Sequence, residues 1–135
     1  MKTIAFDIDK TLLTLTGYPI NNVLNMLIRY KKHGYNIILI TARFPHFHNL
    51  TKRQLQSIGL DKYVDLDEIY YTSGGTKMKH LINNNVLAFF DDLQDNIIDI
   101  IKNQHLLPPE FKLYQVLYKD GDYKIYDTKK TFVYN

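Results

Sequence analysis

The sequence contains no cysteine, and this absence narrows the chemistry open to the protein. Disulfide bonds, thiolate zinc sites and thiol nucleophiles are all excluded. Long hydrophobic runs are missing too: the apolar stretch near the N-terminus covers only Ile4 to Phe6, and no window approaches the roughly 20 apolar residues of a membrane span. We therefore expect no secretory signal, no membrane partner and a cytoplasmic location.

Neither sign of charge dominates the chain. The formal net charge is +3 over 135 residues. This charge permits an anionic substrate, but it does not by itself indicate a nucleic-acid partner, because such a partner needs a clustered basic face. The length predicts one domain, residues 1–135, with a core of its own.

Strand and helix signals alternate through the first hundred residues. Short apolar runs predict strands at 2–7, 36–41, 68–72 and 86–90, and helical spacing of apolar residues predicts helices at 19–33, 48–58, 77–82 and 93–103. This alternation indicates an α/β domain, a Rossmann-like three-layer sandwich with a mostly parallel central sheet.

The pattern changes after the proline pair at 108–109. Residues 112–118 and 123–126 read as two strands joined by the tight-turn signal Asp120-Gly121, so we expect a C-terminal β-hairpin. Aromatic side chains of this segment are able to stack nucleic-acid bases, but packing of an amphipathic hairpin is the favoured interpretation for Tyr114, Tyr118, Tyr123 and Tyr126.

Polar residues close three of the predicted strands. Asp7 ends the first strand, Thr41 the second, and the pair Asp91-Asp92 the fourth. The carboxyl ends of parallel strands meet at one edge of a sheet, where ligands bind, so we expect these groups to converge. Asp9 projects to the same side as Asp7 if the chain stays extended across both.

Carboxylates gathered in this way predict a magnesium site. They resist ionising together unless a cation is present, and Mg²⁺ prefers carboxylate oxygens and often shares a substrate phosphate. One aspartate is then able to attack phosphorus while another serves as general acid and base. Thr41 and Lys77 offer a hydroxyl and a cation for the phosphoryl oxygens.

Four segments, in order, resemble the motifs of the haloacid dehalogenase (HAD) superfamily. Residues 6–12, Phe-Asp-Ile-Asp-Lys-Thr-Leu, are similar to its first motif, Asp-x-Asp-x-Thr after a strand. Residues 40–43, Ile-Thr-Ala-Arg, resemble its second, Lys77 its third, and residues 90–96, with an acidic pair before a helix, its fourth. The matches span residues 4 to about 100.

The resemblance implies a role for each matching residue. Asp7 is implied as nucleophile and metal ligand, and Asp9 as general acid/base with its backbone carbonyl on the metal. Thr41 and Lys77 are implied to hold the phosphoryl group, and Asp92 to bind the metal with Asp91 beside it. The residues expected around the substrate are Lys10, Thr11, Ala42 and Arg43, of which Thr11 steadies the turn.

Three positions leave alternatives open. Position 10 is Lys where the family most often has Gly, which places a cation within reach of substrate. Lys79 lies close to Lys77, and Lys77 is preferred because it comes earlier in the helix, where the helix dipole favours an anion. Arg43 is as well suited to pairing with a carboxylate as to contacting substrate.

Neither interval between the first three motifs has room for a cap domain. The resemblance therefore implies a capless phosphatase, with the loop at 13–18 as a small flap. An open site suits a large substrate, such as a nucleic-acid end or a protein, or closure by a neighbouring subunit of a homo-oligomer. Residues 41–55 are similar to the phosphatase part of polynucleotide kinase/phosphatases and to some nucleotidases.

Each residue taken alone has a structural explanation. An aspartate at a strand end is ordinarily a turn residue, Thr41 is able to cap the next helix, and a single lysine is usually solvated. Asp95 and Asn96 favour a helix start, and a zinc site at His46 and His48 is not favoured.

Taken together, the motifs predict a Mg²⁺-dependent phosphomonoesterase acting through an aspartyl-phosphate, on a nucleotide, a nucleic-acid 3′-phosphate end or another monoester. The alternatives are a phosphotransferase or protein phosphatase on the same scaffold, or a catalytically silent binding module.

Overall fold

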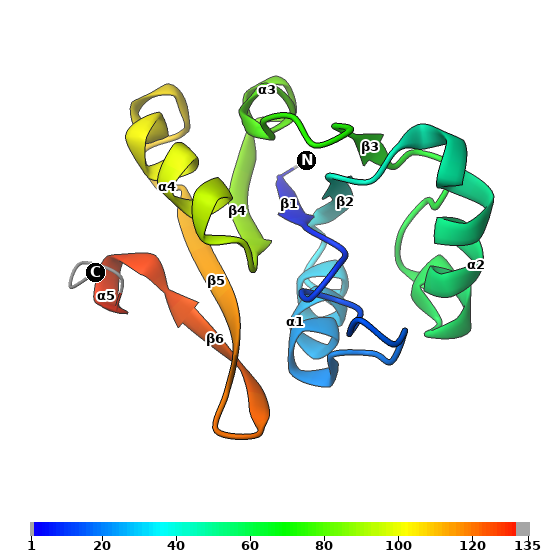
Figure 1. The fold of residues 1–135 in the computed structure, drawn as a ribbon. Coiled ribbons are helices and arrows are strands. Elements are labelled where there is room, and N and C mark those ends of the chain that lie inside the picture. Colours follow the sequence, from blue (N-terminus) through cyan, green and yellow to red (C-terminus); the bar gives the residue numbers. More distant parts are fainter. Residues whose placement is uncertain (1, 132–135) are drawn as a thin grey trace.

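A six-stranded sheet with helices on both faces organises the computed structural model, which describes residues 2–131 (Figure 1). The strands are β1 (Thr3–Phe6), β2 (Asn36–Thr41), β3 (Tyr70–Tyr71), β4 (Val86–Asp91), β5 (Lys112–Lys119) and β6 (Asp122–Asp127). The helices are α1 (Asn21–Lys32), α2 (His48–Ser57), α3 (Met78–Asn83), α4 (Gln94–Lys102) and α5 (Thr128–Thr131).

The strand order is β3-β2-β1-β4-β5-β6. Strands β1 to β5 run parallel and β6 runs antiparallel to β5, so the predicted α/β fold with a mostly parallel central sheet is confirmed. The chain builds β2 and β3 on one side of β1 and then crosses to the other side for β4. The order therefore reverses between β1 and β4, and this switch point is where sheets of this kind bind ligands.

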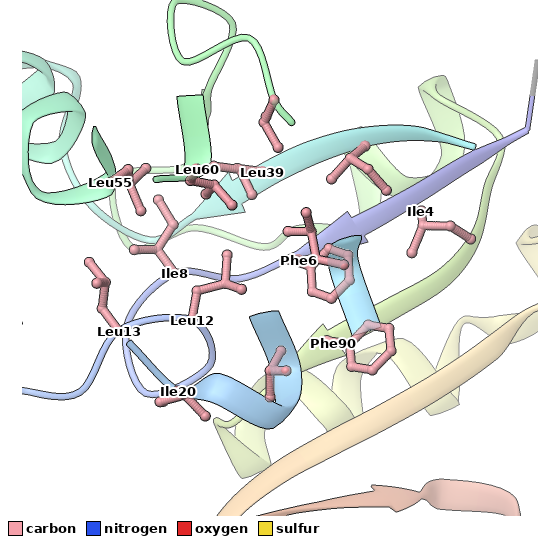
Figure 2. Close-up of a cluster of buried hydrophobic side chains, with 14 of the residues drawn as sticks. Ile4, Phe6, Ile8, Leu12, Leu13, Ile20, Leu39, Leu55, Leu60 and Phe90 are labelled. Atoms are coloured by element: carbon pink, nitrogen blue, oxygen red, sulfur yellow. The ribbon is translucent and has the colours of Figure 1, made fainter. Parts of the chain in front are cut away.

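Two hydrophobic clusters fill the space between the sheet and its helices. On one face, Phe6 and Phe90 stack with ring centroids 4.5 Å apart among side chains that include Val23 of α1 and Leu55 of α2 (Figure 2). On the other face, Ala5 and Phe89 pack in a cluster with side chains of α3 and α4. Residues of β1 alternate between these two clusters, which explains why its sequence is apolar without interruption.

Two elements differ from the sequence prediction. Strand β3 covers only two residues instead of the predicted 68–72, because this edge strand pairs with β2 through Tyr70 and Tyr71 alone. The short helix α5 was not predicted, since the sequence analysis assigned no helix or strand after residue 126. Its first residue, Thr128, is buried and donates a hydrogen bond to the Leu113 carbonyl at 3.0 Å, which ties the helix to β5.

The connection between β5 and β6 has the backbone that its sequence indicates. Asp120 and Gly121 both have positive φ, 55° and 83°, and they join strands whose last pair is Lys119 and Asp122. A two-residue loop with both residues left-handed matches the right-handed twist of an antiparallel pair.

In the part of the chain that the structure describes, no helix has the length and apolar character needed to cross a lipid bilayer.

Candidate functional site

Three carboxylates meet at the switch point between β1 and β4. Asp7 follows β1, Asp91 is the last residue of β4, and Asp92 comes next. Because Phe6 pairs with Phe90 across the two strands, the residues that follow them are neighbours, and the Asp7 amide donates to the Phe90 carbonyl at 2.9 Å. One oxygen of each carboxylate lies within 4.8 Å of the other two.

Lys77 is the cation of this cluster. It lies immediately before α3, and its ammonium donates to Asp7 Oδ1 at 2.7 Å and to Asp91 Oδ2 at 2.9 Å. Its side chain is buried, whereas Lys79 is exposed. The structure therefore brings Lys77, the preferred lysine of the sequence analysis, to the carboxylates and leaves Lys79 outside.

The second oxygen of Asp7 is held by the turn that follows it. The Thr11 hydroxyl donates to Asp7 Oδ2 at 3.0 Å, and both side chains are buried. Lys10 adopts a left-handed backbone with a φ of 60°. This conformation favours glycine, which accounts for the glycine that the resembling family most often has at this position.

Charge in the cluster is unbalanced, because one ammonium faces three carboxylates. Burial raises the pKa of Asp7 well above its usual range, Asp91 raises it further, and Lys77 only partly opposes both. Burial, together with Asp91, also raises the pKa of Asp92. A divalent cation would offset the excess negative charge, and carboxylate oxygens are ligands that Mg²⁺ accepts. The three aspartates could therefore hold a metal ion.

Asp91 is oriented by the start of α4. Its Oδ1 accepts from the Leu93 amide at 3.0 Å, and its Oδ2 accepts from the Asn96 side chain at 3.0 Å as well as from Lys77. Asn96 also lines the site, although the sequence slightly favoured a helix-start role over a site role for it. Its place one turn after the acidic pair was the one signal that pointed to the site.

The Asp9 carboxylate does not join the other three. Arg43 donates from Nε to Asp9 Oδ2 at 2.9 Å and from Nη2 to Asp9 Oδ1 at 2.7 Å. The chain does not continue as a strand past Phe6, so Asp9 is directed to the arginine that follows β2. Of the four aspartates expected at the metal, Asp9 therefore contributes no carboxylate to the converging group, and Arg43 takes its carboxylate-pairing alternative.

Arg43 is itself held in place by α2. Its Nη1 donates to Thr51 Oγ1 at 2.9 Å and to Gln54 Oε1 at 2.6 Å. Neither partner was expected at the site, and only their helical spacing of three residues on one face of α2 hinted at it. Arg43 thus connects α2 to Asp9 and orients that carboxylate.

A cavity of about 220 Å³ opens over these groups. Its walls comprise Asp7, Asp9, Lys10, Ala42, Lys77, Asp91, Asp92, Leu93 and Asn96. Thr41 is buried and is not part of the wall; its hydroxyl accepts a hydrogen bond from the Arg43 amide at 3.2 Å. A hydroxyl that accepts one hydrogen bond keeps its proton for donation.

Two other places that offer binding potential lie apart from this cavity. His48 donates or accepts at Tyr71 Oη over 2.6 Å, and among residues 2–131 the only group of three acidic or histidine ligands is the aspartate cluster, so the disfavoured zinc site gains no support. A cavity of about 440 Å³ lies at the end of α1, between Met26 and Tyr35, at the opposite edge of the sheet and without a carboxylate.

Comparisons with known proteins do not name a family. No family model matches the chain, and no curated protein matches it. Among solved structures, the chain is similar to the hypothetical protein PH1952 from Pyrococcus horikoshii OT3, with 16% identity over 79% of this chain and a TM-score of 0.44. The chain spans 40% of the length of that protein. A likeness of this degree carries no inference about the reaction.

Proposed function

We propose that the chain is a capless, HAD-type phosphatase that hydrolyses phosphomonoesters with Mg²⁺ through an aspartyl-phosphate on Asp7. The observation that supports this proposal is the setting of Asp7. It is buried at the switch point of the sheet, held at one oxygen by Lys77 and at the other by Thr11, with Asp91 and Asp92 beside it.

In the first step, an oxygen of Asp7 attacks phosphorus. A bond forms between this oxygen and phosphorus, and the bond from phosphorus to the ester oxygen breaks. Lys77 and Thr11 fix the orientation of the nucleophile, because each donates to a different oxygen of Asp7. When bound, Mg²⁺ would neutralise the approach of the anionic phosphate to the anionic carboxylate.

We assign the proton transfers to Asp9, which lines the same cavity as Asp7 and is paired with Arg43 through two hydrogen bonds. In the first step the protonated form of Asp9, with one of these hydrogen bonds released, gives its proton to the departing ester oxygen. In the second step it takes a proton from the water that attacks phosphorus, and the bond from Asp7 to phosphorus breaks to release phosphate.

The test is phosphate release by the purified chain with and without Mg²⁺, compared between wild type, Asp7→Asn and Asp61→Asn. Asp61 is exposed and lies outside the site, so it is the matched control. We expect Mg²⁺-dependent release that falls about 10³-fold or more in Asp7→Asn and stays unchanged in Asp61→Asn. Acid quenching during turnover should leave one phosphoryl group on the peptide that contains Asp7.

Turnover by Asp7→Asn at the wild-type rate would contradict the covalent mechanism. Binding of Mg²⁺ and phosphate by the folded wild type without any turnover would favour the catalytically silent binding module.

A further inference from the structure

A second cavity adjoins the one above Asp7. Its volume is about 440 Å³, and it shares two wall residues, Lys10 and Asp92, with the smaller cavity. The two spaces are therefore neighbours at a common rim. A volume of this size lies in the range of roughly 300–1,000 Å³ that is usual for small-molecule sites.

One wall of this cavity is an extension of the sheet. Strand β5 pairs with β4 only as far as Gln115, opposite Asp91. Residues 116–119 continue for about 13 Å, at roughly 3.3 Å per residue, beyond the edge where the carboxylates lie. Strand β6 returns alongside, as Figure 1 shows where β5 runs past the tip of β4. The extension places Leu117, Tyr118 and Tyr123 at the cavity.

Local hydrogen bonds hold both sides of the cavity in place. The loop that carries Leu15 is closed by the Thr14 amide, which donates to the Tyr18 carbonyl at 2.8 Å, and by the Tyr18 amide, which donates to Thr14 Oγ1 at 3.0 Å. Asn22 of α1 donates to the Tyr123 carbonyl at 2.7 Å and ties β6 to the body of the domain. The walls are thus ordered before any ligand arrives, which lowers the entropic cost of binding.

The wall is apolar and aromatic although it faces solvent. Leu15 is 78% exposed and Tyr118 is 65% exposed. Tyr118 and Tyr123 meet edge to face, with ring centroids 4.9 Å apart. A pair of tyrosines with aliphatic neighbours is a suitable surface for stacking a flat ring, and Lys10 adds a cation at the rim between the two cavities.

We propose that three of these side chains, Leu15, Tyr118 and Tyr123, form an aromatic subsite for the leaving group of the substrate; Leu117 precedes Tyr118 on the strand and projects to the opposite face. It rests on the proposed function, which places the phosphoryl group at Asp7. With phosphorus there, the organic part of the ester extends past Lys10 into the larger cavity, and the base of a nucleoside monophosphate stacks on Tyr118. Nucleoside monophosphates are therefore the substrate class, in preference to alkyl or sugar phosphates.

The first experiment measures kcat/KM for adenosine 5′-monophosphate and for glycerol 3-phosphate. We expect wild type to prefer the nucleotide, and Tyr118→Ala to lower the ratio of the two values about 5- to 150-fold, since a stacked base contributes roughly 1–3 kcal/mol. Tyr118→Phe should keep the ratio, because the ring remains. Tyr18→Ala is the matched control, because Tyr18 is 70% exposed and lies outside the cavity wall. Equal kcat/KM values in wild type, or an unchanged ratio in Tyr118→Ala, would overturn the subsite.

The second experiment separates the subsite from catalysis. Adenosine and ribose are titrated into the ¹⁵N-labelled wild type, and amide shifts at Leu15, Tyr118 and Tyr123 are followed. We expect shifts with adenosine that ribose does not produce, and their loss in Tyr118→Ala. Turnover without these shifts would overturn the subsite and leave the proposed phosphatase standing. Shifts in a folded chain that hydrolyses none of the esters would overturn the phosphatase and still support the subsite.

Discussion

Asp7 and Asp9 lie two residues apart, and each pairs with a cation. One of these pairs is buried, and the other is partly exposed to solvent. Asp7 and Lys77 meet at 2.7 Å with side chains that are 7% and 2% exposed. Asp9 and Arg43 also meet at 2.7 Å, but their side chains are 47% and 18% exposed. The shortest distances are equal, but Lys77 also donates to Asp91 and its pair is buried, whereas the Asp9–Arg43 pair is half exposed.

The comparison teaches which pair the fold depends on. When one partner of a buried pair is removed, an uncompensated charge stays in a medium that solvates it poorly. When one partner of a half-exposed pair is removed, water replaces it at little cost. We therefore expect the Asp7–Lys77 pair to contribute both to the free energy of unfolding and to the reaction. The Asp9–Arg43 pair should serve chiefly to orient the Asp9 carboxylate.

The largest effect is expected from Lys77→Met. Without the ammonium, three carboxylates remain together, and the free energy of unfolding should fall by about 3–5 kcal/mol. The measurement is urea unfolding at neutral pH with a chelator present. Lys79→Met, on an exposed lysine two residues away, should change stability by less than about 0.5 kcal/mol. Similar losses in both variants would contradict the conclusion that the buried Asp7–Lys77 pair stabilises the fold.

The next effect is a dependence of the free energy of unfolding on pH in the metal-free protein. Burial raises the pKa of Asp7 above 3.8, so the folded chain binds more protons than the unfolded chain as the pH rises through and beyond that value. The contribution of Asp7 to stability should therefore be highest near the low end of this window and fall with pH until its folded-state pKa is passed, by at most about 1.4 kcal/mol per pH unit.

Unfolding titrations across this window, with a chelator present, measure the slope. Asp7→Asn should reduce it, whereas Asp61→Asn should not. The same dependence of stability on pH in the metal-free wild type and in Asp7→Asn would contradict the electrostatic account of the cluster.

A smaller effect is expected from Arg43→Lys, which tests the role of the partly exposed Asp9–Arg43 pair. Lysine keeps the charge but loses the planar fork that holds Asp9, Thr51 and Gln54 at once. We expect a loss of about 1 kcal/mol in stability and about a tenfold loss in kcat/KM through a misplaced Asp9. Arg53→Lys, on an exposed arginine of α2, should change neither quantity. A stability loss as large as that of Lys77→Met would remove the distinction between the pairs.

The smallest effect concerns the turn that follows the two aspartates. Lys10 has a φ of 60°, a conformation that costs a residue with a side chain about 1 kcal/mol relative to glycine. Lys10→Gly should therefore be more stable than Lys10→Ala by about that amount, since both variants lack the ammonium and only glycine relieves the backbone. Equal unfolding free energies for the two variants would show that the turn is unstrained.

Much of the fold could be predicted because the relevant signals are local. The apolar run at 36–41 coincides with β2, and the helix expected at 48–58 differs from α2 by one residue at its end. Strand β3 was predicted too long, because edge pairing depends on a neighbour that the local pattern does not describe. Helix α5 was missed for a similar reason, since the hydrogen bond from Thr128 to β5 spans 15 residues.

The residues of the candidate site also fall into two groups: those that local sequence signals indicate, and those that only the fold brings together. The sequence by itself determined that Asp7, Thr41 and Asp91-Asp92 would close strands, because buried parallel strands appear as uninterrupted apolar runs and their polar ends are visible in the pattern. Only the tertiary structure decided that Asp92 joins Asp7 while Asp9 turns to Arg43, that Lys77 rather than Lys79 meets the carboxylates, and that Asn96 orients Asp91. Those choices depend on the strand order and on side chains up to 70 residues apart, and local periodicity contains no information about such distant neighbours.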